Sequence, residues 1–107
     1  MNYCFFNGKL TENPITKNVA GANLTTFTLG VEDSWQDANG EKKKRYDYLD
    51  FEVWDTAADT VYQHAKKGDF MFVQASARQN KWENGSGEKK QKITFRVNEF
   101  KIVPVNS

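Results

Sequence analysis

Apolar and polar residues alternate along most of this chain, and a period of two is typical of β-strands with one buried face. The clearest case is residues 46–54, where Leu49, Phe51 and Val53 share one face. Turn-forming pairs such as Asn39-Gly40 separate the alternating segments and favour hairpins. Five strands are predicted, over residues 3–10, 24–31, 46–54, 70–78 and 93–103.

One segment has helical periodicity instead. An apolar stripe at helical spacing predicts a helix over residues 56–67. Thr56 and Asp59 have the spacing of an N-terminal capping box, and Gly68 is a natural left-handed stop. Five strands with a helix between the third and the fourth predict an all-β fold, a five-stranded OB-fold barrel with two long β-hairpins.

Two places interrupt the alternation. Phe100 and Ile102 change parity within the last strand, which predicts a β-bulge near residues 98–99. Strict alternation along the second strand would place Trp35 on the core side. We therefore expect that strand to bulge or end near residues 32–33, which would free Trp35.

Length and composition narrow the class of protein. A chain of 107 residues predicts a single domain over residues 1–107. The lone Cys4 excludes an internal disulfide, and a secretory signal and a long apolar run are both missing, so we expect a cytoplasmic, nucleoid-associated location and no membrane contact. One Cys and one His, His64, cannot form a structural zinc site, and no catalytic pattern is present. No metal, cofactor or enzymatic activity is expected.

Aromatic residues make up 14% of the chain, more than a core of this size needs. If the apolar face of residues 46–54 is buried, Tyr48 and Trp54 face outward beside Asp50 and Glu52. Exposed aromatics on a polar sheet face are suited to base stacking, at about 1–3 kcal/mol for each base. The alternative is that Trp54 closes the end of the barrel or packs under the helix. The two acids are expected to repel phosphate.

A short pattern occurs twice. Trp35 and Trp82 are each followed five residues later by Gly-Glu-Lys-Lys, so each begins a predicted hairpin with a basic returning strand. Because the net charge is only +1, phosphate contacts must come from such local clusters. The alternative is two ordinary hairpins whose Trp side chains fold back onto the barrel. Candidate phosphate ligands in the hairpins are Lys43, Lys44, Lys81 and Lys89.

The chain resembles the DNA-binding domain of bacterial single-stranded DNA-binding proteins over nearly its whole length. The matching segments are residues 8–14 (GKLTENP), 26–29 (TFTL), 34–35 (SW), 48–54 (YLDFEVW), 66–68 (KKG) and 78–82 (RQNKW). The resemblance implies an OB barrel with stacking roles for Trp35, Tyr48, Trp54 and Trp82. It also implies phosphate contacts from Lys67, Arg78 and Lys81.

The resemblance further implies binding of single-stranded DNA without sequence preference, a homo-oligomer (a tetramer or a dimer), and replication or repair proteins as partners. Family members usually continue into an acidic tail, which is absent after residue 103 here, so we expect a truncated form or a tail-less relative. An OB-fold protein-interaction module and an RNA-binding protein are the competing hypotheses. Phe70 and Phe72 are expected to form a subunit interface or to lie under a loop.

Overall fold

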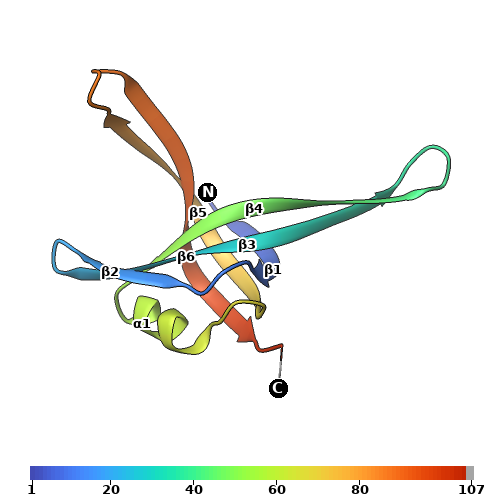
Figure 1. The fold of residues 1–107 in the computed structure, drawn as a ribbon, viewed down its shortest axis with the longest axis horizontal. Helices are drawn as coiled ribbons and strands as arrows, with labels where there is room; N and C mark the ends of the chain where they lie inside the picture. The colour runs from blue at the N-terminus through green and yellow to red at the C-terminus, as the bar shows by residue number, and fades with distance from the viewer. Residues whose placement is uncertain (106–107) are drawn as a thin grey trace.

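A computed structural model of the chain describes residues 1–105, which form a closed β-barrel with two long arms (Figure 1). The elements are β1 (Cys4–Leu10), β2 (Ile15–Val19), β3 (Ala22–Gln36), β4 (Lys42–Trp54), α1 (Asp55–His64), β5 (Phe70–Glu83) and β6 (Lys89–Val103). The strand order is β1-β5-β6-β4-β3-β2, and β1 also pairs with β3, which closes the barrel. The predicted all-β OB-fold barrel, with its helix between β4 and β5, is confirmed.

Aromatic rings fill the centre of the barrel. Phe51 is buried, and its ring lies 5.4 Å from that of Phe27 and 5.6 Å from those of Phe6 and Phe95. These residues come from four different strands whose inward faces follow the alternation. Their side chains therefore join the two halves of the barrel into one core.

The barrel closes where β1 meets β3. Lys9 pairs with Gly30, and Gly8 lies against the same strand. A Cβ atom at Gly8 would approach the carbonyl oxygen of Gly30 to 2.5 Å, closer than real Cβ contacts allow. Glycine at this position is what permits the two backbones to meet.

Helix α1 packs against β3 at one end of the barrel. Ala58 and Val61 are buried, and the hydroxyl of Thr25 donates a hydrogen bond of 2.8 Å to the carbonyl oxygen of Ala58. No helix among residues 1–105 is long and apolar enough to cross a membrane.

The helix begins at Asp55, one residue before the predicted start, but the predicted capping box was wrong. Trp54 is the N-cap and makes no side-chain capping bond, since its indole has no acceptor atom. The carboxylate of Asp59 accepts a hydrogen bond from Asn23 at 3.1 Å. The helix ends at His64 rather than at residue 67. Asp69 accounts for this early end, because its carboxylate accepts from the backbone N–H of Lys66 at 3.0 Å and forms a turn there.

The pairing of β3 also differs from the prediction. β3 runs to Gln36 and pairs with β4 without any register shift, so the bulge or strand end expected at residues 32–33 is absent. The bulge expected at residues 98–99 is confirmed: Gln74 pairs with Glu99 and Ala75 with Val97, which leaves Asn98 as the extra residue. β2 is an additional short strand, and all its residues are exposed.

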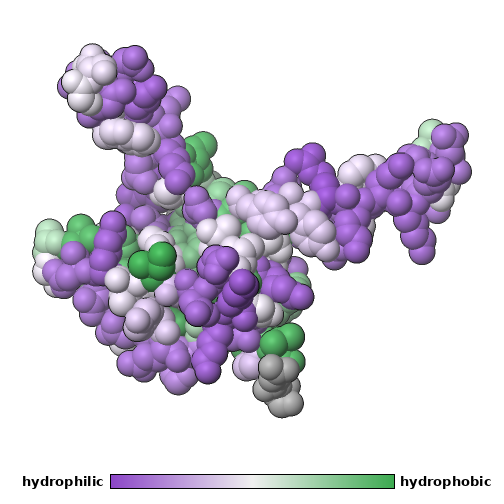
Figure 2. Space-filling model, viewed as in Figure 1, coloured by the Kyte–Doolittle hydropathy of each residue, from purple (hydrophilic) through white to green (hydrophobic). Residues whose placement is uncertain are grey.

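Two hairpins extend beyond the barrel in different directions (Figure 1). We call residues 32–46 of β3 and β4 the first arm, and residues 78–93 of β5 and β6 the second arm; nearly all their residues are exposed. Figure 2 shows that hydrophilic side chains cover both arms. The radius of gyration is 16.0 Å, against about 13 Å for a compact domain of this size, because of these arms.

Candidate nucleic-acid interface

The outward sides of β4, β6 and β5 belong to one side of the sheet, joined where β4 pairs with β6 at two positions. β4 pairs with β6 in parallel, with Glu52 beside Arg96, and β5 pairs with the other edge of β6. Residues that lie opposite each other in a ladder share a face, so Trp82 is on the same side as its partner Lys90. Lys90 is an even number of residues from Arg96 along β6, so both point to the same side of the sheet. The structure therefore places Tyr48, Trp54 and Trp82 on the same side of the sheet, whereas Trp35 has the parity of the core.

Tyr48 is the most exposed aromatic of this face, at 66%. Its ring lies over Gly30 on β3, where a Cβ atom would come within 3.3 Å of the ring. The ring borders an open groove of about 690 Å³ that Lys67 also lines. Sequence reasoning missed Gly30, which leaves room for the ring, although a glycine inside a predicted strand was a signal of close approach.

Trp54 is half-buried where β4 passes into α1. The guanidinium carbon of Arg96 lies 5.7 Å from the centre of its ring, within cation–π range. The indole Nε1 is enclosed and has no hydrogen-bond partner among residues 1–105. Trp54 thus has the predicted outward parity, and its ring is half-buried beside Arg96.

The two acids of this face are paired with cations from β6. Asp50 accepts a hydrogen bond from the Thr28 hydroxyl at 2.7 Å and lies 3.3 Å from the ammonium of Lys92. Glu52 lies 3.3 Å from Nε of Arg96. Thr28 and then Lys92 hold the pKa of the Asp50 carboxyl below its ordinary value. Each of the two acids that are expected to repel phosphate therefore has a cation beside it.

Lys92 and Arg96 are members of the face that the sequence reading did not include. Both lie on β6, at alternate positions that point away from the core. The alternation of Ile93, Phe95 and Val97 was a signal of this orientation. Their closeness to the acids of β4, however, follows from the parallel pairing of β4 and β6, which no local pattern reveals.

The two arm tryptophans are exposed. Trp35 is 47% and Trp82 is 49% exposed, so neither folds back onto the barrel. Trp35 lies opposite Lys43 and Trp82 lies opposite Lys90 in their ladders. The Trp35 side chain is exposed although the strand has no bulge. It is on the side of β3 that faces the core within the barrel, but the first arm extends past the core, so nothing covers it there.

The predicted basic residues fall into two groups. Lys43, Lys44 and Lys67 are ion-paired with Glu41 at 3.2 Å, Glu32 at 3.1 Å and Glu12 at 3.8 Å, respectively. The hydrogen bond to Glu32 raises the pKa of Lys44. Arg78, Lys81 and Lys89 have no carboxylate within 4.0 Å among residues 1–105. All six are exposed.

The model of the single-strand binding protein family matches residues 1–103 of this chain. The chain belongs to this family. Single-stranded DNA-binding protein 2 of Listeria monocytogenes is 30% identical over 90 residues, which are 83% of this chain and 55% of that protein. The single-stranded DNA-binding protein of Enterococcus faecalis is 29% identical over 83 residues, 77% of this chain and 43% of that protein. The chain thus spans about half the length of these two members of the single-strand binding protein family.

Solved structures support the fold of this family member. A Plasmodium falciparum SSB in complex with ssDNA has a TM-score of 0.83 at 24% identity, over 99% of this chain and 96% of that one. A deletion mutant of the single-stranded DNA binding protein from Thermus aquaticus has a TM-score of 0.88 at 22% identity, over 99% of this chain and 52% of that one. At these identities the likeness bears on the barrel and not on the roles of single residues.

Proposed function

We propose that this chain is a single OB domain that binds single-stranded DNA without sequence preference and carries out no catalytic chemistry. The observation that carries the proposal is the exposure of Trp35 and Trp82 on basic arms, each opposite a lysine. Every base has a π-face, so stacking on tryptophan tolerates any sequence. Membership of the single-strand binding protein family supports the same conclusion.

In this proposal, bases stack on the aromatic residues and phosphates contact the basic ones. The stacking residues are Trp35, Tyr48, Trp54 and Trp82. The phosphate contacts are Lys43, Lys44, Lys67, Arg78, Lys81 and Lys89. Each stacked base contributes about 1–3 kcal/mol. The biological role would be protection of single strands during replication, recombination or repair, in the cytoplasm at the nucleoid and alongside replication or repair proteins.

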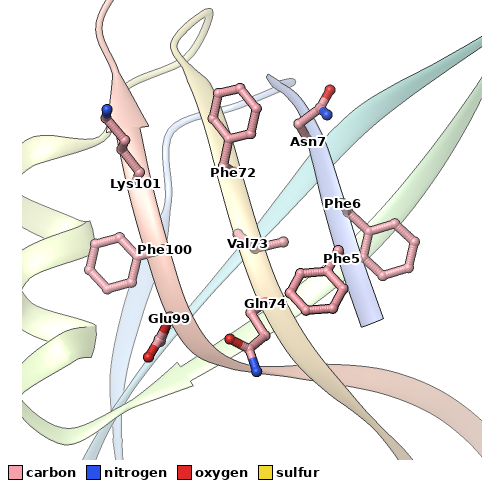
Figure 3. Close-up of a pocket in the computed structure, with 9 residues that line it drawn as sticks. All are labelled: Phe5, Phe6, Asn7, Phe72, Val73, Gln74, Glu99, Phe100 and Lys101. Atoms are coloured by element: carbon pink, nitrogen blue, oxygen red, sulfur yellow. The ribbon is translucent and has the colours of Figure 1, made fainter. Parts of the chain in front are cut away.

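A second copy of the chain is the proposed occupant of the face shown in Figure 3, where phenylalanines lie beside the polar side chains of Asn7, Gln74, Glu99 and Lys101. Phe5 is 73% and Phe72 is 48% exposed, and both line a groove on β1, β5 and β6. One edge of β1 pairs with β5 from Cys4 to Lys9. Among residues 1–105 its other edge pairs with β3 only at Lys9 and Leu10, so this second edge is unpaired before Lys9. We expect a homo-oligomer, a tetramer or a dimer, in analytical ultracentrifugation.

Titration with a homopolymeric dT oligonucleotide, followed by Trp fluorescence at low and moderate salt, tests the proposal. Strong quenching that weakens as salt rises is expected from stacking combined with phosphate neutralisation. Absence of quenching at micromolar protein and low salt would contradict DNA binding and favour an OB-fold protein-interaction module. Equal binding of a uridine homopolymer would extend the function to RNA.

A further inference from the structure

The tips of the two arms are copies of one local structure. In each arm a side-chain oxygen, from Asp37 or Asn84, accepts hydrogen bonds from two backbone N–H groups of the turn, at 2.9 Å in the first arm and 3.0 Å in the second. Each turn also contains a glycine with a φ of +79°, Gly40 or Gly87. The repeated sequence pattern therefore corresponds to a repeated structure.

A glutamate follows each turn and holds the lysine that lies opposite the tryptophan. The Lys43 ammonium is 3.2 Å from the Glu41 carboxylate and 4.0 Å from that of Asp37. The Lys90 ammonium is 3.0 Å from the Glu88 carboxylate. Because each of these lysines lies opposite the tryptophan in its ladder, the ion pair keeps each glutamate near the tryptophan's side of its arm.

Similar ion pairs link other cations of the arms and of the outward face to carboxylates. Lys44 is paired with Glu32, Lys92 with Asp50, and Arg96 with Glu52. Ion pairs on a solvated hairpin are ordinary, but here the same glutamate, lysine and tryptophan recur in the same geometry in both arms. To neutralise a phosphate, the lysine opposite either tryptophan, Lys43 or Lys90, would have to exchange its carboxylate partner for the phosphate.

We propose that Glu41 and Glu88 are internal counterions of the arms, which the phosphate backbone displaces when DNA binds. The inference rests on the proposed DNA binding and concerns its strength and salt dependence. The exposed ion pairs are individually weak, so phosphate can replace them. The released carboxylate stays attached close to the phosphate and repels it, which lowers the affinity. Because each glutamate–lysine pair has no net charge, DNA binding releases fewer counterions to the solvent than binding by unpaired lysines would.

The test compares dT oligonucleotide binding by the wild type and the Glu41→Gln/Glu88→Gln double variant across a salt series. Both substitutions are in exposed side chains, at 68% and 64%, so an unchanged thermal midpoint is expected. The double variant is expected to bind about threefold to tenfold more tightly at low salt. Its plot of log affinity against log salt should steepen by up to about 1.4, since two lysines are freed and each phosphate contact on a single strand contributes about 0.7.

Glu83→Gln is the matched control for Glu88→Gln. Glu83 lies in the same arm opposite Lys89 but forms no ion pair among residues 1–105, and Gln36 already occupies the corresponding position of the first arm. If only the loss of negative charge matters, Glu83→Gln and Glu88→Gln will raise the affinity equally, and the inference is wrong. It is also wrong if the double variant matches the wild type in affinity and slope. If neither the wild type nor the double variant binds the dT oligonucleotide, the proposed function is wrong as well.

Discussion

The barrel and the arms are made from the same strands, yet they differ in what their side chains do. In the barrel half of β4, Phe51 and Val53 are buried in the core. In the arm half of the same strand, residues 42–46 are exposed on both faces. The hydrogen-bonded ladder continues unchanged through both halves. The alternation of apolar and polar residues therefore stabilises the protein only in the barrel, where other strands cover one face of β4. In the arm both faces of the hairpin are exposed and available for binding.

This difference implies that stability and binding respond to different substitutions. Two-stranded hairpins are only marginally stable by themselves. The arms are held by their roots in the barrel, by turn hydrogen bonds and by cross-strand pairs. Changes in the barrel should therefore alter global unfolding, and changes in the arms should alter binding and local opening.

The sharpest contrast is expected between Phe51→Ala and Trp82→Ala. Removal of the Phe51 ring leaves a cavity among three other aromatic rings and should lower the free energy of unfolding by about 3–5 kcal/mol. Trp82→Ala removes an exposed side chain and should cost less than about 1 kcal/mol. Urea unfolding measures both. Similar losses for the two variants would contradict the division between barrel and arms.

Two glycines provide a smaller version of the same contrast. Gly8→Ala would drive a methyl group against the Gly30 carbonyl oxygen and should cost about 1–3 kcal/mol of unfolding free energy. Gly85 lies in the turn of the second arm, where a Cβ atom meets nothing within 4 Å. Gly85→Ala should leave the thermal midpoint nearly unchanged. Equal midpoints for both variants would show that barrel closure does not depend on Gly8.

Asn84→Ala removes two turn hydrogen bonds from the second arm. Each such bond contributes about 1 kcal/mol, but the loss should be confined to this arm. Amide hydrogen exchange should become faster in residues 78–93 and stay unchanged in α1 and in the barrel. A fall in the protection of Val53 or Met71 would mean that the arm and the barrel unfold together.

The smallest effect expected is the pH dependence that Asp50 contributes. Its pKa is lowered in the folded protein, so its interactions with Thr28 and Lys92 contribute stability above the unfolded pKa, which is about 4. This contribution is lost as the pH falls through the folded pKa. The difference in thermal midpoint between the wild type and Asp50→Asn should therefore be constant above about pH 5 and shrink below about pH 4. A constant difference down to pH 2 would contradict the role of Asp50.

Much of the barrel could be predicted because its strands bury one face and so alternate. The bulge at Asn98 was visible as a change of parity. β2 was not predicted because all five of its residues are exposed and show no alternation. Its position depends on a two-residue turn in which Ala20 and Gly21 both have positive φ, as type I′ turns require.

The aromatic part of the candidate site was easier to predict than its electrostatics. Tyr48, Trp35 and Trp82 were found from local patterns, and all three are exposed. The sequence could not show that the first arm continues straight past the core, which is why a bulge was wrongly expected before Trp35. The pairing of Asp50 and Glu52 with β6 depends on barrel closure, a long-range property.

The most direct test of the central claim is to remove both arm tryptophans and measure stability and binding together. The Trp35→Ala/Trp82→Ala variant should keep a thermal midpoint within a few degrees of the wild type. Its affinity for a dT oligonucleotide, measured by isothermal titration calorimetry, should fall at least about thirtyfold if each tryptophan stacks one base. Wild-type affinity in a folded double variant would contradict the claim that the arms bind DNA by stacking.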